Sequence, residues 1–299
     1  MKKILMAIVA MTMLIATSCK EDNVNALDDL TFKDIPDDAF CFTAQEPACK
    51  VTLSVMDERG TKPTCSFEYY DATTQSWASY TPGTDITLAD VGDKAYFRAV
   101  TSGNSSLSTS NGSNYYHFTS DKNVAVSGNI MYLLDQTGSK KDLTLGINDY
   151  AFYMLFKDMS KLVDASGLIL PAKTLAKYCY QEMFFDCKAL KAAPNLPATT
   201  LAESCYLSMF SNCMSLTSAT DLHATTLADY CYREMFKGCS SLGVGHGSGP
   251  SGAKTLVVPE YADDYVTWGL DMFDGTAGGY DTPNEGDTYF FYDATQYRN

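Results

Sequence analysis

Six cysteines at a regular spacing are the residues whose chemistry the sequence raises first. They occur as Cys-x₇-Cys pairs at Cys179/Cys187, Cys205/Cys213 and Cys231/Cys239, each pair 26 residues after the last. This spacing does not match the usual zinc motifs, and no histidine lies suitably beside it. On a helix the two cysteines of a pair would be ~12 Å apart, and neighbouring helices at ~8–10 Å also exceed disulfide reach. We expect buried free thiols, with inter-repeat disulfides of an exported protein as the alternative.

The three histidines form no catalytic arrangement. His117 lies in an aromatic segment typical of a strand, and His223 occupies a repeat position. His246 lies in a glycine-rich stretch, 243–249, that lacks the Lys-Ser/Thr of a phosphate loop and is expected to be a flexible insertion. There is no Gly-x-Ser-x-Gly or His-Glu-x-x-His motif. We therefore expect no enzyme activity, no catalytic residue and no cofactor.

An acidic group near the C-terminus raises calcium binding as an alternative. Its members are Asp271, Asp274, Asp281, Glu285 and Asp287. They lack the alternating oxygen ligands of an EF-hand loop, so we expect no metal site.

The N-terminus carries a secretory leader. Lys2 and Lys3 precede an apolar run at 4–16, too short to span a bilayer comfortably, and small residues then lead to Cys19. The stretch Ala16-Thr17-Ser18-Cys19 resembles a bacterial lipoprotein lipobox, which implies a signal peptide at 1–18 and lipid attachment, for example of palmitate, at Cys19. A plain secreted protein is the alternative. Several acyl chains on one residue give stable anchoring.

Residues 19–38 are acidic and poor in aromatics, as expected of a solvated tether. Lys20-Glu21-Asp22 resembles the export signal of surface lipoproteins in some Gram-negative gut anaerobes, which implies an outer-membrane protein facing the cell exterior. The lipid anchor is the only membrane contact expected. The chain has 22 Lys and Arg against 36 Asp and Glu, a formal charge of −14. This excess of negative charge disfavours nucleic acid as a partner.

Residues 39–140 have the pattern of an all-β domain. Seven short aromatic and β-branched segments, separated by turn residues, predict a β-sandwich of the immunoglobulin-like kind. The predicted strands are Phe40–Thr43, Lys50–Met56, Ser66–Tyr70, Asp85–Leu88, Ala95–Val100, Tyr115–Thr119 and Asn129–Leu133. Trp77 is expected at a hairpin tip, where it packs over the sheet or stacks on a sugar ring.

Residues 141–299 contain a repeat of 26 residues, the strongest pattern in the chain. Its unit is Thr-Leu-Ala-x-x-Cys-Tyr-x-x-Met-Phe-x-x-Cys-x-x-Leu, with worn copies at 150–162 and 261–273. On a helix the shared positions of 175–187 fall on one half of the surface, which predicts a buried helical face. Tyr180, Tyr206 and Tyr232 lie at its edge; we favour core packing over a sugar-stacking platform. The segments 191–196 and 217–222 predict one short parallel strand per coil.

The repeat resembles that of BspA-like leucine-rich-repeat surface proteins, through the Met-Phe-x-x-Cys-x-Ser-Leu element at 235–242. The resemblance covers a little under half of the chain. It implies a short α/β leucine-rich-repeat solenoid with a C-terminal cap, following the β-sandwich in a multidomain protein. It also implies a role in cell-surface adhesion or host recognition. This chain departs from the pattern in having three full copies and in lacking both cysteines in its last copy.

These features predict a surface lipoprotein that recognises a protein or glycan ligand. The strand side of the repeats is the expected binding face, with candidate residues Lys191, Asn195, Thr217 and Asp221. The alternative is glycan capture by the β-sandwich through Trp77, with the repeats as a spacer.

Overall fold

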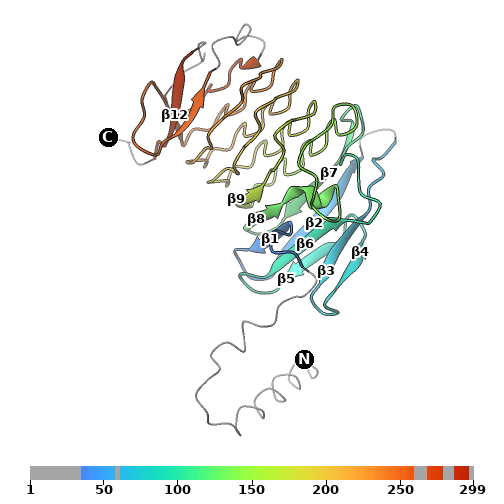
Figure 1. Cartoon of the computed structure of the whole chain (residues 1–299). Coiled ribbons are helices and arrows are strands. Elements are labelled where there is room, and N and C mark those ends of the chain that lie inside the picture. Colours follow the sequence, from blue (N-terminus) through green and yellow to red (C-terminus); the bar gives the residue numbers. More distant parts are fainter. Residues whose placement is uncertain (1–34, 58–60, 259–267, 279–285, 296–299) are drawn as a thin grey trace, which may run out of the picture. The chain divides into compact units, whose positions relative to one another are not determined.

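A computed structural model describes residues 35–57, 61–258, 268–278 and 286–295 (Figure 1). These residues are organised almost entirely as β-strands and turns in several sheets. Residues 36–299 form one compact unit. The leader, Cys19 and the start of the tether lie outside the described residues. No helix in the described part of the chain is long and apolar enough to cross a membrane.

Two sheets lie at the N-terminal side of this unit. The first has the order β4-β3-β6-β1-β8-β9 and is antiparallel except for the parallel pair β8/β9; the second has the order β5-β2-β7 and is antiparallel throughout. The strands are β1 (Cys41–Ala44), β2 (Cys49–Asp57), β3 (Phe67–Asp71), β4 (Ser76–Tyr80), β5 (Asp85–Leu88), β6 (Lys94–Ala99), β7 (Asn114–Ser120), β8 (Val124–Asn129) and β9 (Leu162–Ile169).

Aromatic residues fill the space between these two sheets. Phe42 and Phe97 of the first sheet and Phe118 of the second are fully buried. The ring centroid of Phe118 lies 4.8 Å from that of Phe42 and 5.2 Å from that of Phe97. Buried and half-buried residues alternate along β6 and β7, as expected of strands with one face in a core. This face-to-face packing is consistent with the predicted β-sandwich.

Six of the seven predicted strands are confirmed, and the seventh is wrong. Ile130–Leu133 form a 3₁₀ helix, η1, because the Asn129 side chain accepts a hydrogen bond from the Met131 N–H and caps the turn. All four η1 residues are buried, so they do not alternate as strand residues do. The strand lies just before them, as β8. Trp77 is not at the hairpin tip but within β4, opposite Tyr70 of β3.

The first sheet continues past the predicted boundary at residue 140. β9, which directly follows the first worn repeat copy, pairs with β8 and is the last strand of the first sheet. Phe156 of the first worn copy stacks on Phe118, with ring centroids 5.9 Å apart. The hydrophobic core is therefore continuous across the boundary, and the division into two domains stays a prediction.

The predicted helix over 175–187 is wrong. In residues 35–57 and 61–258 the only helical element is η1, and 175–187 form a series of turns. Alternate N–H groups bond within the coil to the carbonyl three residues before, as Gln181 does to Tyr178 and Met183 to Tyr180. The others bond to the next coil, as Tyr180 does to the Cys205 carbonyl and Phe184 to the Met209 carbonyl. Figure 1 shows these coils following one another between β9 and β12.

The reason for the turns lies in a period of four rather than 3.6. Two buried residues alternate with two outward-facing ones, as in Cys179-Tyr180 and Met183-Phe184. The second outward residue of each group has a left-handed backbone; for Tyr178, Glu182 and Asp186 the φ angles are 57°, 51° and 59°. A left-handed residue every fourth position interrupts an α-helix. Each coil between residues 150 and 238 has three of these left-handed positions. In successive coils the third one is occupied by Asp158, Asp186, Asn212 and Gly238, and Asp, Asn and Gly are residue types that tolerate this conformation.

Stacked rings fill the interior of the coils. Tyr180, Tyr206 and Tyr232 are at most 2% exposed and nearly parallel, with centroids 5.8 and 6.0 Å apart. Phe184, Phe210 and Phe236 form a second stack at 5.3 and 5.6 Å. The prediction that the tyrosines pack in the core is confirmed. The hydroxyl of Tyr180 is buried with no hydrogen-bond partner in the described structure.

The segments 191–196 and 217–222 pair in parallel, as predicted, through isolated bridges rather than full strands. The bridges join Ala192 to Ser218 and Leu196 to Leu222. After the last full copy, β10 (Leu242–His246), β12 (Thr288–Asp293) and β11 (Lys254–Val257) form a third sheet in that order. The prediction of a flexible insertion at 243–249 is wrong, because residues 242–246 pair with β12. Phe291 of β12 contacts Phe236, covering the end of the phenylalanine stack.

Candidate ligand-binding surfaces

The predicted strand-side residues Lys191 and Thr217 lie side by side. The backbone N–H of Thr217 donates to the Lys191 carbonyl at 3.0 Å, and the Thr217 hydroxyl lies 3.4 Å from the same oxygen. Lys191 is exposed and Thr217 is half-buried. This pair is open to solvent, and its role in binding stays a prediction.

Asn195 and Asp221 hold neighbouring segments together. The Thr220 hydroxyl donates to Asn195 Oδ1 at 2.9 Å. Asp221 accepts the Thr255 N–H at 2.8 Å and pairs with Lys254 Nζ at 3.1 Å. Partial burial by itself would raise the pKa of Asp221. The hydrogen bond from the Thr255 N–H and the contact with Lys254 outweigh this effect, so the pKa is lowered. Asp221 thus joins β11 to the coil before it, and this carboxylate is engaged in structural contacts.

Trp77 is also engaged. The Arg98 guanidinium carbon lies 3.9 Å from the centroid of the Trp77 ring, and Tyr70 contacts the ring edge-on at 5.7 Å. Arg98 is held there by Glu68, with Nε and Oε2 2.7 Å apart. A guanidinium over the indole uses one of the two faces on which a sugar would stack.

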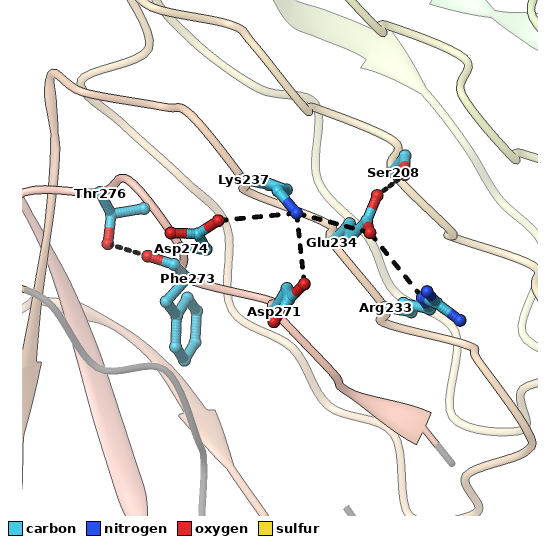
Figure 2. Close-up of polar contacts among 8 residues, drawn as sticks. All are labelled: Ser208, Arg233, Glu234, Lys237, Asp271, Phe273, Asp274 and Thr276. Carbon is cyan, nitrogen blue, oxygen red and sulfur yellow. Dashed lines mark hydrogen bonds and ion pairs between the residues drawn. The ribbon is translucent and has the colours of Figure 1, made fainter. Parts of the chain in front are cut away.

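Charged side chains gather where the last coils meet (Figure 2). The Lys237 ammonium lies between Glu234, Asp271 and Asp274, at 3.6, 3.2 and 3.5 Å from their carboxylates. Two further groups contact Glu234: the Ser208 hydroxyl at 3.3 Å and Arg233 Nε at 3.8 Å. Partial burial by itself would lower the pKa of Lys237, but the neighbouring carboxylates outweigh this effect and raise the pKa. The Lys237 ammonium therefore links its coil to the one after it, and the Ser208–Glu234 contact links it to the one before.

The acidic cluster considered for calcium is divided among other contacts. Asp271 and Asp274 face Lys237, Asp287 lies 3.2 Å from His246 Nε2, and Asp281 and Glu285 lie outside the described residues. Among the described residues, no three His, Cys, Asp or Glu side chains lie close enough together to hold a metal ion.

The repeat cysteines are buried free thiols, as predicted. The thiols of Cys187, Cys213 and Cys239 donate to carbonyls of the preceding coil, those of Phe156, Phe184 and Phe210, at 3.0, 3.1 and 3.0 Å. Burial raises the pKa of every repeat thiol, for Cys231 to about 12. A buried, protonated thiol is a poor nucleophile, and Cys187, Cys213 and Cys239 each connect two coils.

A strip of half-buried rings is a surface feature that the sequence analysis missed. Its members, called here the aromatic strip, are His117, Tyr115, Tyr153, Tyr150 and Tyr178. Successive centroids are 6.1, 5.5, 5.3 and 4.5 Å apart. His117 and Tyr115 alternate with buried residues along β7, and the sequence could have revealed this alternation. The sequence could not show that β7 packs against the repeat copies.

A shallow open depression of about 370 Å³ borders the Tyr178 end of the strip. Lys177 and Glu203 line it, beside the apolar side chains of Leu145 and Leu201. Glu203 accepts the Tyr178 hydroxyl at 2.7 Å and Lys177 Nζ at 2.7 Å. The hydrogen bond to Glu203 is the main reason that the pKa of Tyr178 rises to about 12.

Comparison with known proteins adds no relative: no family model, no curated protein and no solved structure matches this chain.

Proposed function

We propose that this protein is a surface lipoprotein that recognises a protein or glycan ligand outside the cell. In this proposal Cys19 carries the acyl anchor, residues 19–38 form the tether, and the folded unit presents a binding surface. The β-rich N-terminal part serves as an immunoglobulin-like sandwich, and the repeats serve as a short solenoid of the BspA-like leucine-rich-repeat kind.

One observation carries the proposal. Bridges join equivalent residues of successive coils, as Ala192 and Ser218, and backbone hydrogen bonds elsewhere run at a constant offset, as from Tyr180 to Cys205. Each repeat position therefore forms a column of side chains along one surface. The inner positions carry the same Cys, Tyr, Met and Phe in each full copy, whereas most outward ones differ; Tyr178 recurs as Tyr230 and Glu182 as Glu234. A fixed scaffold that displays variable side chains in columns is the arrangement that repeat proteins use for binding. The recessed, protonated thiols fit a binding role better than catalysis.

The test is a binding screen with residues 20–299, which include the whole compact unit. The immobilised chain is offered mucins, extracellular-matrix proteins and a glycan array. We expect saturable binding to one of these classes. Saturable binding to none of them would contradict the proposal.

Variants then locate the surface. Lys191→Ala with Thr217→Ala removes the open strand-side pair, and Lys161→Ala with Ser160→Ala, on the outside of the first worn copy, is the control. Lost binding in the first pair alone would place the ligand on the strand side. Unchanged binding in both pairs would remove the strand side from the proposal.

Anchoring has its own test. We expect Cys19→Ser to release the protein from the outer membrane and to abolish its labelling by palmitate. A Cys19→Ser variant that still reached the outer membrane and still incorporated palmitate would contradict the lipid attachment.

A further inference from the structure

We propose that the aromatic strip binds a neutral saccharide chain, with the sugar rings lying against the tyrosine rings and sugar hydroxyls bonding to the Lys177–Glu203 pair. This inference rests on the proposed recognition function and names a ligand class and a site for it. The site is separate from both Trp77 and the strand-side residues.

The first argument is that the rings are held in place before any ligand arrives. Tyr115 and Tyr153 meet at 88°, Tyr153 and Tyr150 at 81°, and Tyr150 and Tyr178 stack at 16°. Gly112 approaches so closely that a Cβ there would lie 2.9 Å from the Tyr150 ring. Rings fixed by their neighbours lose little conformational entropy on binding.

The second argument is the chemistry of the surface. A half-buried tyrosine offers an apolar ring beside a hydroxyl, and a sugar offers apolar C–H faces beside hydroxyls. Met56 lies opposite Tyr115 on the neighbouring strand, extending the apolar area. At the other end, Lys177 and Glu203 supply a donor and an acceptor for hydroxyl groups. The strip therefore presents an apolar centre with polar groups at one end.

The third argument is charge, which favours a neutral ligand. Burial lowers the pKa of His117, so this ring is uncharged at pH 7. The positive charge of Lys177 is balanced by Glu203, the carboxylates of Asp158 and Asp149 act on His117 and Tyr178, and the whole chain has a formal charge of −14. A sulfated or sialylated chain would be repelled, whereas a neutral one pays no such cost.

The experiment measures binding of neutral hexasaccharides (cellohexaose, laminarihexaose, mannohexaose) and of a glycan array to residues 20–299. Tyr115→Ala and Tyr153→Ala each remove one ring, and we expect each to weaken binding of the neutral probe roughly tenfold. Tyr153→Phe keeps the ring and is expected to bind within about twofold of the parent. Trp77→Ala removes an aromatic ring outside the strip and should leave binding unchanged. Thermal melting of each variant checks that it is folded.

The outcomes separate the two proposals. Saccharide binding that survives both strip variants but is lost in Trp77→Ala overturns the strip as the site. Preference for sulfated or sialylated glycans overturns the neutral ligand. If a protein binds and no saccharide does, the recognition function stands and the strip proposal fails. If nothing binds, both fail.

Discussion

The six repeat thiols make the stability of this protein sensitive to alkaline pH. All six are buried, and burial holds their pKa values above the ordinary 9.0. A group whose pKa is raised by folding stabilises the folded state fully below its unfolded pKa, and that contribution is lost as pH rises toward the folded pKa. The affected range therefore begins near pH 9.

The magnitude follows from linkage. At pH 10 a thiol that ionises only in the unfolded chain lowers the free energy of unfolding by about 1.4 kcal/mol. Six such thiols give about 8 kcal/mol, against a typical total stability of about 5–15 kcal/mol. We expect the free energy of unfolding, measured by urea titration with tryptophan fluorescence under reducing conditions, to fall by at least about this amount between pH 8 and pH 10. Cys65 and the three buried tyrosines of the coils add to the loss, because folding raises their pKa values too.

A matched pair of variants isolates the thiols from other alkaline effects. Replacing Cys187, Cys213 and Cys239 by Ala removes three of these thiols, so the loss between pH 8 and pH 10 should be about 4 kcal/mol smaller than in the parent. Replacing the fully buried Leu190, Leu216 and Leu242 by Val disturbs the same coils without removing a titrating group. Its loss should match that of the parent. Equal losses in the two triple variants would refute the reasoning.

Four further predictions follow from the coils and the first sheets. Tyr180→Phe removes a buried hydroxyl without a hydrogen-bond partner, so it should leave the free energy of unfolding unchanged or raise it by about 1 kcal/mol. Tyr80→Phe removes a hydroxyl that donates to the Thr84 and Leu53 carbonyls, so it should lower the free energy of urea unfolding by about 1–2 kcal/mol. The opposite order would contradict these hydrogen-bond assignments. Asn212 has a left-handed backbone with φ 62°, which a β-branched residue tolerates poorly. Asn212→Val should therefore lower the free energy of unfolding by about 2 kcal/mol and Asn212→Gly by less than about 1 kcal/mol. Equal melting temperatures of the two variants would argue against the left-handed backbone. Far-UV circular dichroism of residues 20–299 should lack the paired helical minima, and their presence at helical strength would restore the helix over 175–187. The repeat thiols should react with a thiol reagent only in denaturant under non-reducing conditions, and fewer than four reacting there would indicate disulfides.

Much of the interior could be read from the residues themselves. The 26-residue period identified which residues are buried, because positions kept between copies are those that face neighbouring coils. It also placed the tyrosines in the core and the cysteines as free thiols. In the N-terminal part, alternation of aromatic and polar residues located six of seven predicted strands, since a strand with one face in a core alternates regardless of its partners.

The incorrect prediction of a helix over 175–187 shows what a single repeat copy cannot reveal. Within one coil, a four-residue period fits a helix face loosely and a series of turns equally well. The turns prevail because alternate N–H groups find carbonyls in the next coil, partners that a single copy does not contain. The left-handed residues Glu182 and Asp186 donate their backbone N–H groups to the carbonyls of Leu207 and Ser211 in the next coil.

The candidate surfaces depended most on tertiary structure. Tyr115 and Tyr153 are 38 residues apart in the sequence, and only the packing of β7 against the first worn repeat brings their rings to 5.5 Å. In the same way, the position of Arg98 over Trp77 follows from the pairing of β3 with β4 and β6. The sequence by itself determined which side chains are buried, because burial follows local patterns of apolar residues. Which exposed rings lie together was decided by the fold, because that depends on contacts between distant segments.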